Sequence, residues 1–184
     1  MEVKARLRDK AGVLEKLKAN GLEIHGEKYQ KDLVFFPNDI KELTQHLLGR
    51  NYMRIREEKK NGITRVIFTL KQPRTNQTDC IEHEVEIQEK DISEMTLLIE
   101  TLGYYQFITI EKTRITASMG DIEICIDEVA EIGSYIELEK FGDEKDAIKI
   151  QNDLYALLES WDIKKEDYTS DGYDLLVYKN RQKN

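Results

Sequence analysis

The stretch that decides the fold reads Gly120-Asp-Ile-Glu-Ile-Cys-Ile-Asp-Glu-Val-Ala-Glu-Ile-Gly-Ser-Tyr-Ile-Glu-Leu-Glu139. Apolar and polar residues alternate in it, which is typical of β-strands with one apolar and one charged face. We therefore predict strands at residues 122–128 and 134–139, joined by a turn. Because alternate residues of a strand share a face, Glu123 and Asp127 lie on the charged face of the first strand, and Glu137 and Glu139 on that of the second.

The same alternation occurs through much of the remaining chain. The dipeptide Asn61-Gly62 separates two such segments and indicates a tight hairpin between them. A polar loop is predicted at 72–79. The further predicted strands are 2–8, 22–36, 52–58, 63–71, 81–87 and 104–116.

Helices are predicted where apolar residues recur at helical spacing between capping residues. Asp9 and Gly21 bound the first helix, and Asp91 and Gly103 bound another. The others are a short helix through Leu43 and Leu47, a helix at about 144–160 and one helical turn at 174–178. Few of these helices separate strands as parallel crossovers, and no linker or repeat is visible. The pattern favours one α+β domain, residues 1–184, with an antiparallel sheet or barrel and helices outside it.

Composition restricts the function classes. The 184 residues are 40% hydrophobic and 35% charged, which suits a globular chain, and the net charge of −8 would repel nucleic acid and anionic membranes. No apolar run is long enough for a signal peptide or a membrane span. Cys80 and Cys125 lack the paired spacing of a zinc site, and we interpret both as ordinary strand residues of a cytoplasmic protein.

Several predicted strands carry two like charges on one face. Arg54 and Arg56 form one such pair, and Lys112 and Arg114 another. Like charges side by side repel each other unless water or a counter-charge separates them. Either the charged faces are solvated, or the sheet closes so that basic strands bind phosphate and acidic strands hold Mg²⁺ or Mn²⁺.

These segments together resemble the CYTH superfamily of triphosphate tunnel enzymes, within it the branch of class IV adenylate cyclases and thiamine triphosphatases. The most specific segment is 120–139, with Gly-x-aromatic-x-Glu-x-Glu at its end, and the likeness spans nearly the whole chain. Asp32 with Phe35 and Phe36, and the Tyr173-Asp-Leu-Leu176 segment, add weaker support. The family's Glu-x-Glu-x-Lys signature is reduced here to Glu2-Val-Lys4, because its first Glu would precede Met1.

The resemblance implies a closed antiparallel barrel whose inner wall carries the catalytic groups, with Mg²⁺ or Mn²⁺ as cofactor. Lys4 and Lys71 are the candidates for a catalytic role. The implied triphosphate-binding residues are Lys4, Arg54, Arg56, Lys71, Lys112 and Arg114. The implied metal ligands are Glu2, Glu84, Glu86, Asp127, Glu137 and Glu139.

The resemblance leaves several functions open. A cyclase would convert ATP to cyclic AMP and pyrophosphate, whereas a triphosphatase would hydrolyse thiamine triphosphate, a nucleoside triphosphate or inorganic tripolyphosphate. The incomplete first motif also allows a non-catalytic nucleotide or polyphosphate binder, and a plain structural domain is a further reading. We expect the cyclase-like reaction, a small-molecule triphosphate as partner, no nucleic acid or membrane, and a possible homodimer.

Overall fold

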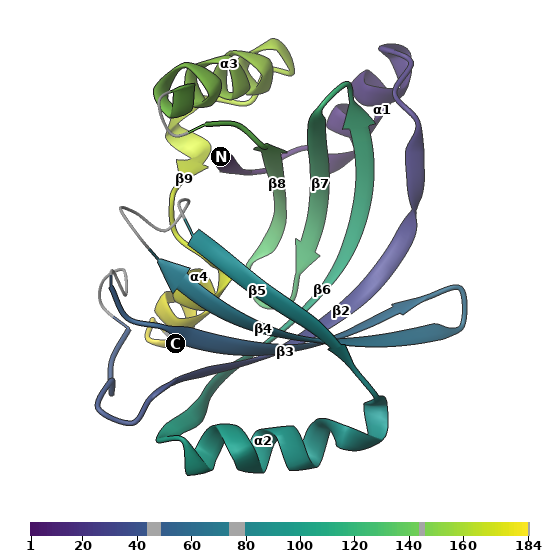
Figure 1. The fold of residues 1–184 in the computed structure, drawn as a ribbon. Helices are drawn as coiled ribbons and strands as arrows, with labels where there is room; N and C mark the ends of the chain where they lie inside the picture. Colours follow the sequence, from purple (N-terminus) through teal and green to yellow (C-terminus); the bar gives the residue numbers. More distant parts are fainter. Residues whose placement is uncertain (44–48, 74–79, 144–145, 184) are drawn as a thin grey trace. The chain divides into compact units, whose positions relative to one another are not determined.

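The computed structural model describes residues 1–43, 49–73, 80–143 and 146–183. Within these ranges nine strands and four α-helices form an α+β fold (Figure 1). The strands are β1 (Glu2–Arg6), β2 (Ile24–Pro37), β3 (Tyr52–Lys60), β4 (Ile63–Pro73), β5 (Cys80–Ile87), β6 (Tyr104–Met119), β7 (Ile122–Val129), β8 (Gly133–Lys140) and β9 (Tyr168–Thr169). The α-helices are α1 (Lys10–Ala19), α2 (Ile92–Thr101), α3 (Ala147–Ser160) and α4 (Tyr173–Arg181).

The strands form one antiparallel sheet in the order β5-β4-β3-β2-β6-β7-β8-β1-β9. The neighbours β7 and β8 pair in a register that places Glu139 opposite Glu123, and β8 and β1 in one that places Glu139 opposite Glu2. The predicted antiparallel sheet with helices is therefore confirmed. Among the described residues no hydrogen-bonded pairing joins β9 back to β5, so hydrogen bonds do not close the sheet.

The chain divides into two compact units. The first comprises Met1–Glu27, Thr113–Val129 and Gly133–Ser170, and the second comprises Lys28–Lys112, Ala130–Ile132 and Asp171–Asn184. The long strands β2 and β6 each contribute residues to both units. Each unit has its own hydrophobic core, so each can be described by itself.

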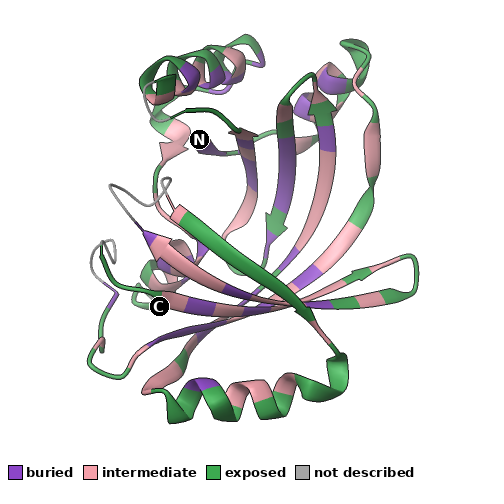
Figure 2. Cartoon of the chain, in the orientation of Figure 1, coloured by how far each residue is buried: buried purple, intermediate pink, exposed green. Residues whose placement is uncertain are grey.

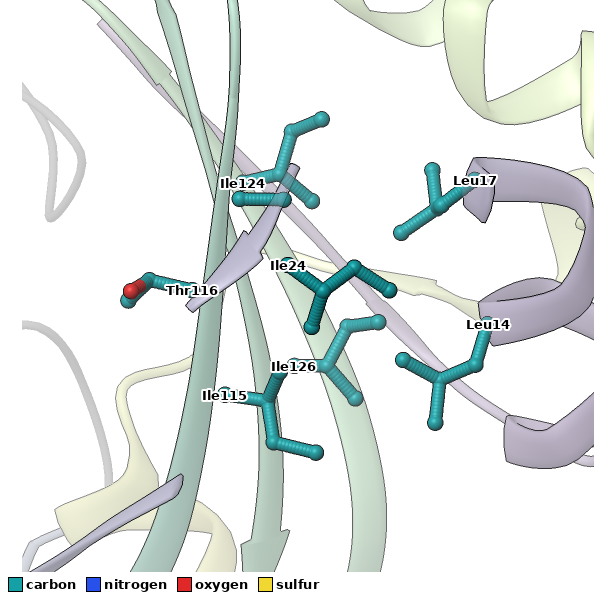
Figure 3. Close-up of a pocket in the computed structure, with 8 residues that line it drawn as sticks. Leu14, Leu17, Ile24, Ile115, Thr116, Ile124 and Ile126 are labelled. Carbon is teal, nitrogen blue, oxygen red and sulfur yellow. The ribbon is translucent and has the colours of Figure 1, made fainter. Parts of the chain in front are cut away.

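In the first unit, α1 and α3 cover the apolar faces of β1, β7 and β8. Figure 3 shows Leu14 and Leu17 of α1 pointing toward Ile124 and Ile126 of β7, while Thr116 of β6 points to the opposite side of the sheet. Leu154 and Leu158 of α3 are buried in the same core. The apolar half of the period-two pattern is thus removed from water by helices, and the polar half faces the other way.

In the second unit, α2 packs on the apolar face of β2, β3, β4 and β5. Ile99 of α2 is buried among Phe35, Met53, Ile55 and Val66 from the strands. The opposite side of α2 is exposed, as Figure 2 shows, and carries the half-exposed Leu98. The helix therefore stabilises the unit through one face only.

Local signals in the sequence predicted most element boundaries. Asp9 caps α1 by accepting a hydrogen bond from the Gly12 amide at 2.9 Å, and Asn61 and Gly62 both have positive φ, as the predicted hairpin turn requires. Asp91 occupies the N-cap position of α2 as predicted, but it also ends a short 3₁₀ turn, and its side chain makes no capping hydrogen bond.

Other boundaries differ from the prediction. Strand β6 continues to Met119 instead of ending at residue 116, and Gln72 and Pro73 belong to β4 instead of a loop. The C-terminal helical turn is a full helix, α4, because its Leu175 and Val177 are buried. The short helix predicted through Leu43 and Leu47 has not begun at residue 43, and Leu47 lies outside the described ranges. Residues 74–79 of the predicted loop and Glu144, the predicted start of α3, also lie outside them. No helix in these ranges is long and apolar enough to cross a membrane.

Two neighbouring substitutions in α2 test its packing. Ile99→Ala should lower the free energy of unfolding by about 2–5 kcal/mol, because it leaves a cavity in the core of the second unit. Leu98→Ala, on the exposed side, should change it by about 0.5 kcal/mol or less. Urea denaturation followed by circular dichroism measures both, and equal effects would contradict the packing described.

Candidate functional site

The polar faces of the first unit bring Lys4, Arg114, Asp127 and Glu137 together, and we call these residues the first charge cluster. Arg114 donates from Nε to Oδ1 of Asp127 at 2.7 Å, and its Nη2 reaches the other Asp127 oxygen and Glu137. Asp127 is fully buried. Burial alone would lower the pKa of Arg114, but the carboxylates of Glu137 and Asp127 raise it well above its usual value. Arg114 is therefore a permanent cation here.

Lys4 lies on β1 directly opposite Glu137 of β8. Its ammonium is 3.1 Å from Glu137 and 3.4 Å from Glu2, and the residue is almost completely buried. Glu137 therefore contacts two cations, Lys4 and Arg114, from different strands. A buried ammonium is tolerated only beside an anion, and Glu137 and Glu2 supply that anion for Lys4.

An acidic row adjoins the first charge cluster. Glu2, Glu139 and Glu123 are register partners on β1, β8 and β7. Cys125 lies two residues beyond Glu123 on the same face of β7, opposite Glu137, with its thiol 3.5 Å from Glu123. Burial, with the nearby carboxylates, raises the pKa of Cys125 to about 12, so this thiol stays protonated and unreactive at neutral pH.

The second unit carries the second charge cluster, which comprises Asp32, Arg54, Arg56, Lys71 and Lys112 with the β5 carboxylates Glu82 and Glu84. Arg56 donates through Nε and Nη2 to the two oxygens of Asp32, each at 2.7 Å. Asp32 is buried on β2 and pairs in register with Arg56 of β3. Burial would raise its pKa, but Arg56, and also Arg54 and Lys112, lower it far below the usual value.

Arg54 spans β3, β4 and β5. Its Nη2 is 3.1 Å from Thr69 Oγ1 and 3.1 Å from Glu84, and Thr69 donates to the same Glu84 oxygen at 3.0 Å. Its buried Nε has no hydrogen-bond partner within the described part of the chain. Burial and the neighbouring Arg56 lower the pKa of Arg54. A donor left unpaired in such a place suits an anion that supplies the missing acceptor.

The two lysines of the second charge cluster lie beside tyrosine rings. Lys71 is 2.6 Å from Glu82, and its ammonium is 5.9 Å from the centre of the Tyr52 ring. Lys112 is buried with its ammonium 4.6 Å from the centre of the Tyr173 ring. Both lysines are therefore positioned by aromatic faces as well as by neighbouring charges.

The structure gathers most of the predicted site residues and separates others. The predicted metal ligands Glu2, Asp127, Glu137 and Glu139 belong to the first unit, whereas Glu84 and Glu86 belong to the second. Glu86 is exposed and pairs with Arg65 at 2.8 Å instead of joining other carboxylates. Carboxylates of the acidic row suit Mg²⁺ or Mn²⁺ by donor type, although within the described ranges no three acidic, histidine or cysteine side chains are already placed around one metal position.

Some site residues were missed by the sequence interpretation. Glu123 completes the acidic row; the alternation placed it on the charged face of β7, but no site role was predicted for it. Thr69 and Glu82 bind site cations, but only the register of β3, β4 and β5 reveals this. Asp32 entered the sequence interpretation through weak family likeness alone, and its pairing with Arg56 comes from the β2–β3 register.

The CYTH domain family matches residues 1–173. The chain belongs to the CYTH family. A protein of Methanocaldococcus jannaschii named "Putative adenylate cyclase MJ0240" is 28% identical over 176 residues, covering 94% of this chain and 95% of that protein. The similarity to CYTH enzymes inferred from segment 120–139 is confirmed.

Solved structures share the fold of this CYTH chain. The PH1819 protein of Pyrococcus horikoshii superposes with a TM-score of 0.80 at 23% identity, covering 97% of this chain and 98% of that one. HpAC1 from Hippeastrum, described as having a dominant triphosphatase activity, has a TM-score of 0.62 at 17% identity, covering 93% and 90%. At these identities the likeness supports the fold alone.

The buried Asp32–Arg56 pair predicts a specific pH dependence. Because folding lowers the pKa of Asp32, its charge stabilises the protein above about pH 4, and this contribution is lost as the pH falls below that value. Asp32→Asn should therefore lower the free energy of unfolding by about 3 kcal/mol at pH 7, since Arg56 loses a buried partner.

The stability difference between Asp32→Asn and the wild type should then shrink between pH 4 and pH 2.5 in urea denaturation. Asp39→Asn is the matched control, because Asp39 pairs with Arg50 at 2.7 Å on the exposed surface. A difference that is independent of pH would argue against a charged Asp32.

Proposed function

We propose that this CYTH protein is a metal-dependent enzyme acting on the triphosphate of ATP or a related organic triphosphate, with adenylate cyclase chemistry as the first candidate. The observation that carries the proposal is the second charge cluster, where Arg54, Arg56 and Lys112 all act on the single buried carboxylate of Asp32. The cluster as a whole holds four cations, Arg54, Arg56, Lys71 and Lys112, against the three carboxylates Asp32, Glu82 and Glu84. The excess positive charge suits further anionic oxygens, and a triphosphate supplies several.

The two clusters differ in composition, and we assign metal binding to one and phosphate binding to the other. The first charge cluster and its acidic row hold more carboxylates than cations, namely Glu2, Glu123, Asp127, Glu137 and Glu139 beside Lys4 and Arg114. The second charge cluster holds more cations than the first. We therefore assign metal binding to Glu2, Glu137 and Glu139, and phosphate binding mainly to Arg54, Arg56, Lys71 and Lys112.

Glu2, Glu137 and Glu139 would hold the metal, which would supply positive charge against the negative charge that develops during phosphoryl transfer. Asp32 binds Arg56 side-on through Nε and Nη2, which fixes the direction of the guanidinium plane. Arg54 can satisfy its buried Nε with a phosphate oxygen. Lys71 and Lys4 complete the proposed set as the cations that contact the reacting phosphate or orient the attacking oxygen. The closed tunnel implied by the resemblance remains part of this proposal.

In the cyclase reaction, the 3′-hydroxyl of ATP attacks the α-phosphorus and loses its proton, the bond to the bridging oxygen breaks, and pyrophosphate leaves with cyclic AMP as product. The relative from Methanocaldococcus jannaschii, named as a cyclase, favours this reaction. A triphosphatase reaction is the second candidate, in which water attacks the terminal phosphorus and orthophosphate leaves. The dominant triphosphatase activity described for HpAC1 favours it.

The deciding experiment incubates the protein with ATP or tripolyphosphate and Mg²⁺ or Mn²⁺ and resolves the products by ³¹P NMR. Cyclic AMP with pyrophosphate supports the cyclase, and orthophosphate release supports the triphosphatase. Binding without turnover identifies a non-catalytic binder. Absence of both turnover and a thermal shift with metal and tripolyphosphate together rejects the proposed function.

Two cations on β4 provide a matched test of phosphate binding. Lys71 pairs with Glu82 at 2.6 Å and Arg65 pairs with Glu86 at 2.8 Å, so both bridge to β5 from the same strand face. Lys71→Met should lower kcat/KM by about 100-fold, the loss typical of a donor that stabilises developing charge. Arg65→Met should stay within about two-fold, since Arg65 is exposed outside the cluster. Equal losses of kcat/KM for the two variants in steady-state kinetics would contradict the assignment of Lys71 to phosphate binding.

A second matched pair tests which carboxylates hold the metal. Glu139→Gln should raise the Mg²⁺ concentration needed for half-maximal turnover by at least the roughly ten-fold that even a residue supporting a metal ligand contributes. Glu86→Gln should leave it unchanged, because Glu86 is exposed and pairs with Arg65. If a metal titration showed a larger increase for Glu86→Gln than for Glu139→Gln, the metal site would have to be assigned to β5 instead.

A further inference from the structure

Helix α4 supplies a ring to one of the cations assigned to phosphate binding. The ammonium of Lys112 lies 4.6 Å from the centre of the Tyr173 ring, and Lys112 and Tyr173 are both buried. Tyr173 begins α4 and is the last residue of the CYTH match, so the remainder of the helix lies beyond it. The aromatic face is a further contact of a cation that already acts on Asp32.

The far end of α4 is tied to the same unit. Arg181 binds Glu131 through Nε at 2.9 Å and through Nη2 at 2.6 Å, and Asn180 donates to the Glu131 carbonyl at 3.1 Å. The ring of Tyr178 is 5.3 Å from that of Phe107 on β6, the strand that carries Lys112. Anchored at both ends, the helix holds Tyr173 at a defined place along β6.

An aromatic face suits this position for an electrostatic reason. Arg54, Arg56 and Lys112 all act on Asp32, so these cations lie in one electrostatic environment and repel one another. A second carboxylate would hold Lys112 but would also neutralise it and repel a phosphate. The negative face of a tyrosine ring attracts the ammonium and carries no net charge, so the cation keeps its charge for an incoming anion.

We infer that Tyr173 is a positioning residue that holds the Lys112 ammonium for a phosphate oxygen of the substrate, which makes α4 part of the substrate site. The inference rests on the proposed function, because it assigns Lys112 to phosphate binding. The ring acts through Lys112, so its removal should weaken binding of the triphosphate and have no effect once Lys112 is absent.

The test is a double-mutant cycle read by steady-state kinetics with the substrate found by ³¹P NMR, or by tripolyphosphate binding if there is no turnover. Tyr173→Leu should raise KM or Kd by about ten-fold, the size expected of a desolvated cation–ring contact. Tyr173→Phe keeps the ring and should stay within about two-fold of the wild type. Lys112→Ala should weaken binding at least as much as Tyr173→Leu, and the double variant should be no weaker than Lys112→Ala.

A second replacement separates ring electrostatics from folding. Tyr173→pentafluorophenylalanine keeps an aromatic ring of similar shape but reverses the sign of its face, so it should reproduce the loss seen with leucine while its melting temperature stays near that of Tyr173→Phe. Additive effects in the double variant, failure of phenylalanine to restore binding, or no loss with the fluorinated ring would each overturn the inference. If Lys112→Ala leaves binding unchanged, the assignment of Lys112 in the proposed function fails with it, whereas loss with Lys112→Ala and none with Tyr173→Leu rejects the role of Tyr173 alone.

Discussion

Arg56 binds the buried carboxylate of Asp32 side-on, through Nε and Nη2, with two hydrogen bonds of 2.7 Å, and Arg114 binds Asp127 in the same way in the other unit. Charges taken out of water are tolerated only when a partner satisfies them, so each arginine requires its aspartate on a neighbouring strand. The register of the sheet places that aspartate opposite the arginine. A shift of one residue between β2 and β3 would turn one partner to the other face and leave a buried charge alone.

The same alternation that pairs these charges also places the helices. Residues between the charged positions, such as Ile124 and Ile126 on β7 or Phe35 on β2, are apolar and buried under helices. The packing of α1, α3 and α2 therefore determines which strand face is left for charge. The same strands carry core residues on one face and site residues on the other. A substitution that tilts a strand in the core will therefore also displace a side chain of the site.

Membership of the CYTH family and the composition of the clusters favour separate regions for metal binding and for phosphate binding. A wall rich in carboxylates on β1, β7 and β8 suits a hard divalent cation, and arginines and lysines on β3, β4 and β6 suit phosphate oxygens. Glu86 departs from this division, since it pairs with the exposed Arg65. The metal site of the proposed function is therefore assigned to the first unit.

Period-two alternation in the sequence was enough to predict the strands, their polar faces and the antiparallel fold class. Side chains of successive strand residues point to opposite faces, so a local pattern shows which residues share a face. Family likeness along nearly the whole chain added the candidate residues. Those that occur in the two clusters are Lys4, Arg54, Arg56, Lys71, Glu84, Lys112, Arg114, Asp127 and Glu137. The N-cap position of Asp91 was predictable, but the 3₁₀ turn before α2 and the lack of a side-chain capping bond were not. Only the tertiary structure decided which carboxylate faces which cation, that Thr69 and Glu84 share Arg54, and that a ring from α4 lies over Lys112. These contacts join residues far apart in the chain, and strand register and helix packing, which no local pattern encodes, bring them together.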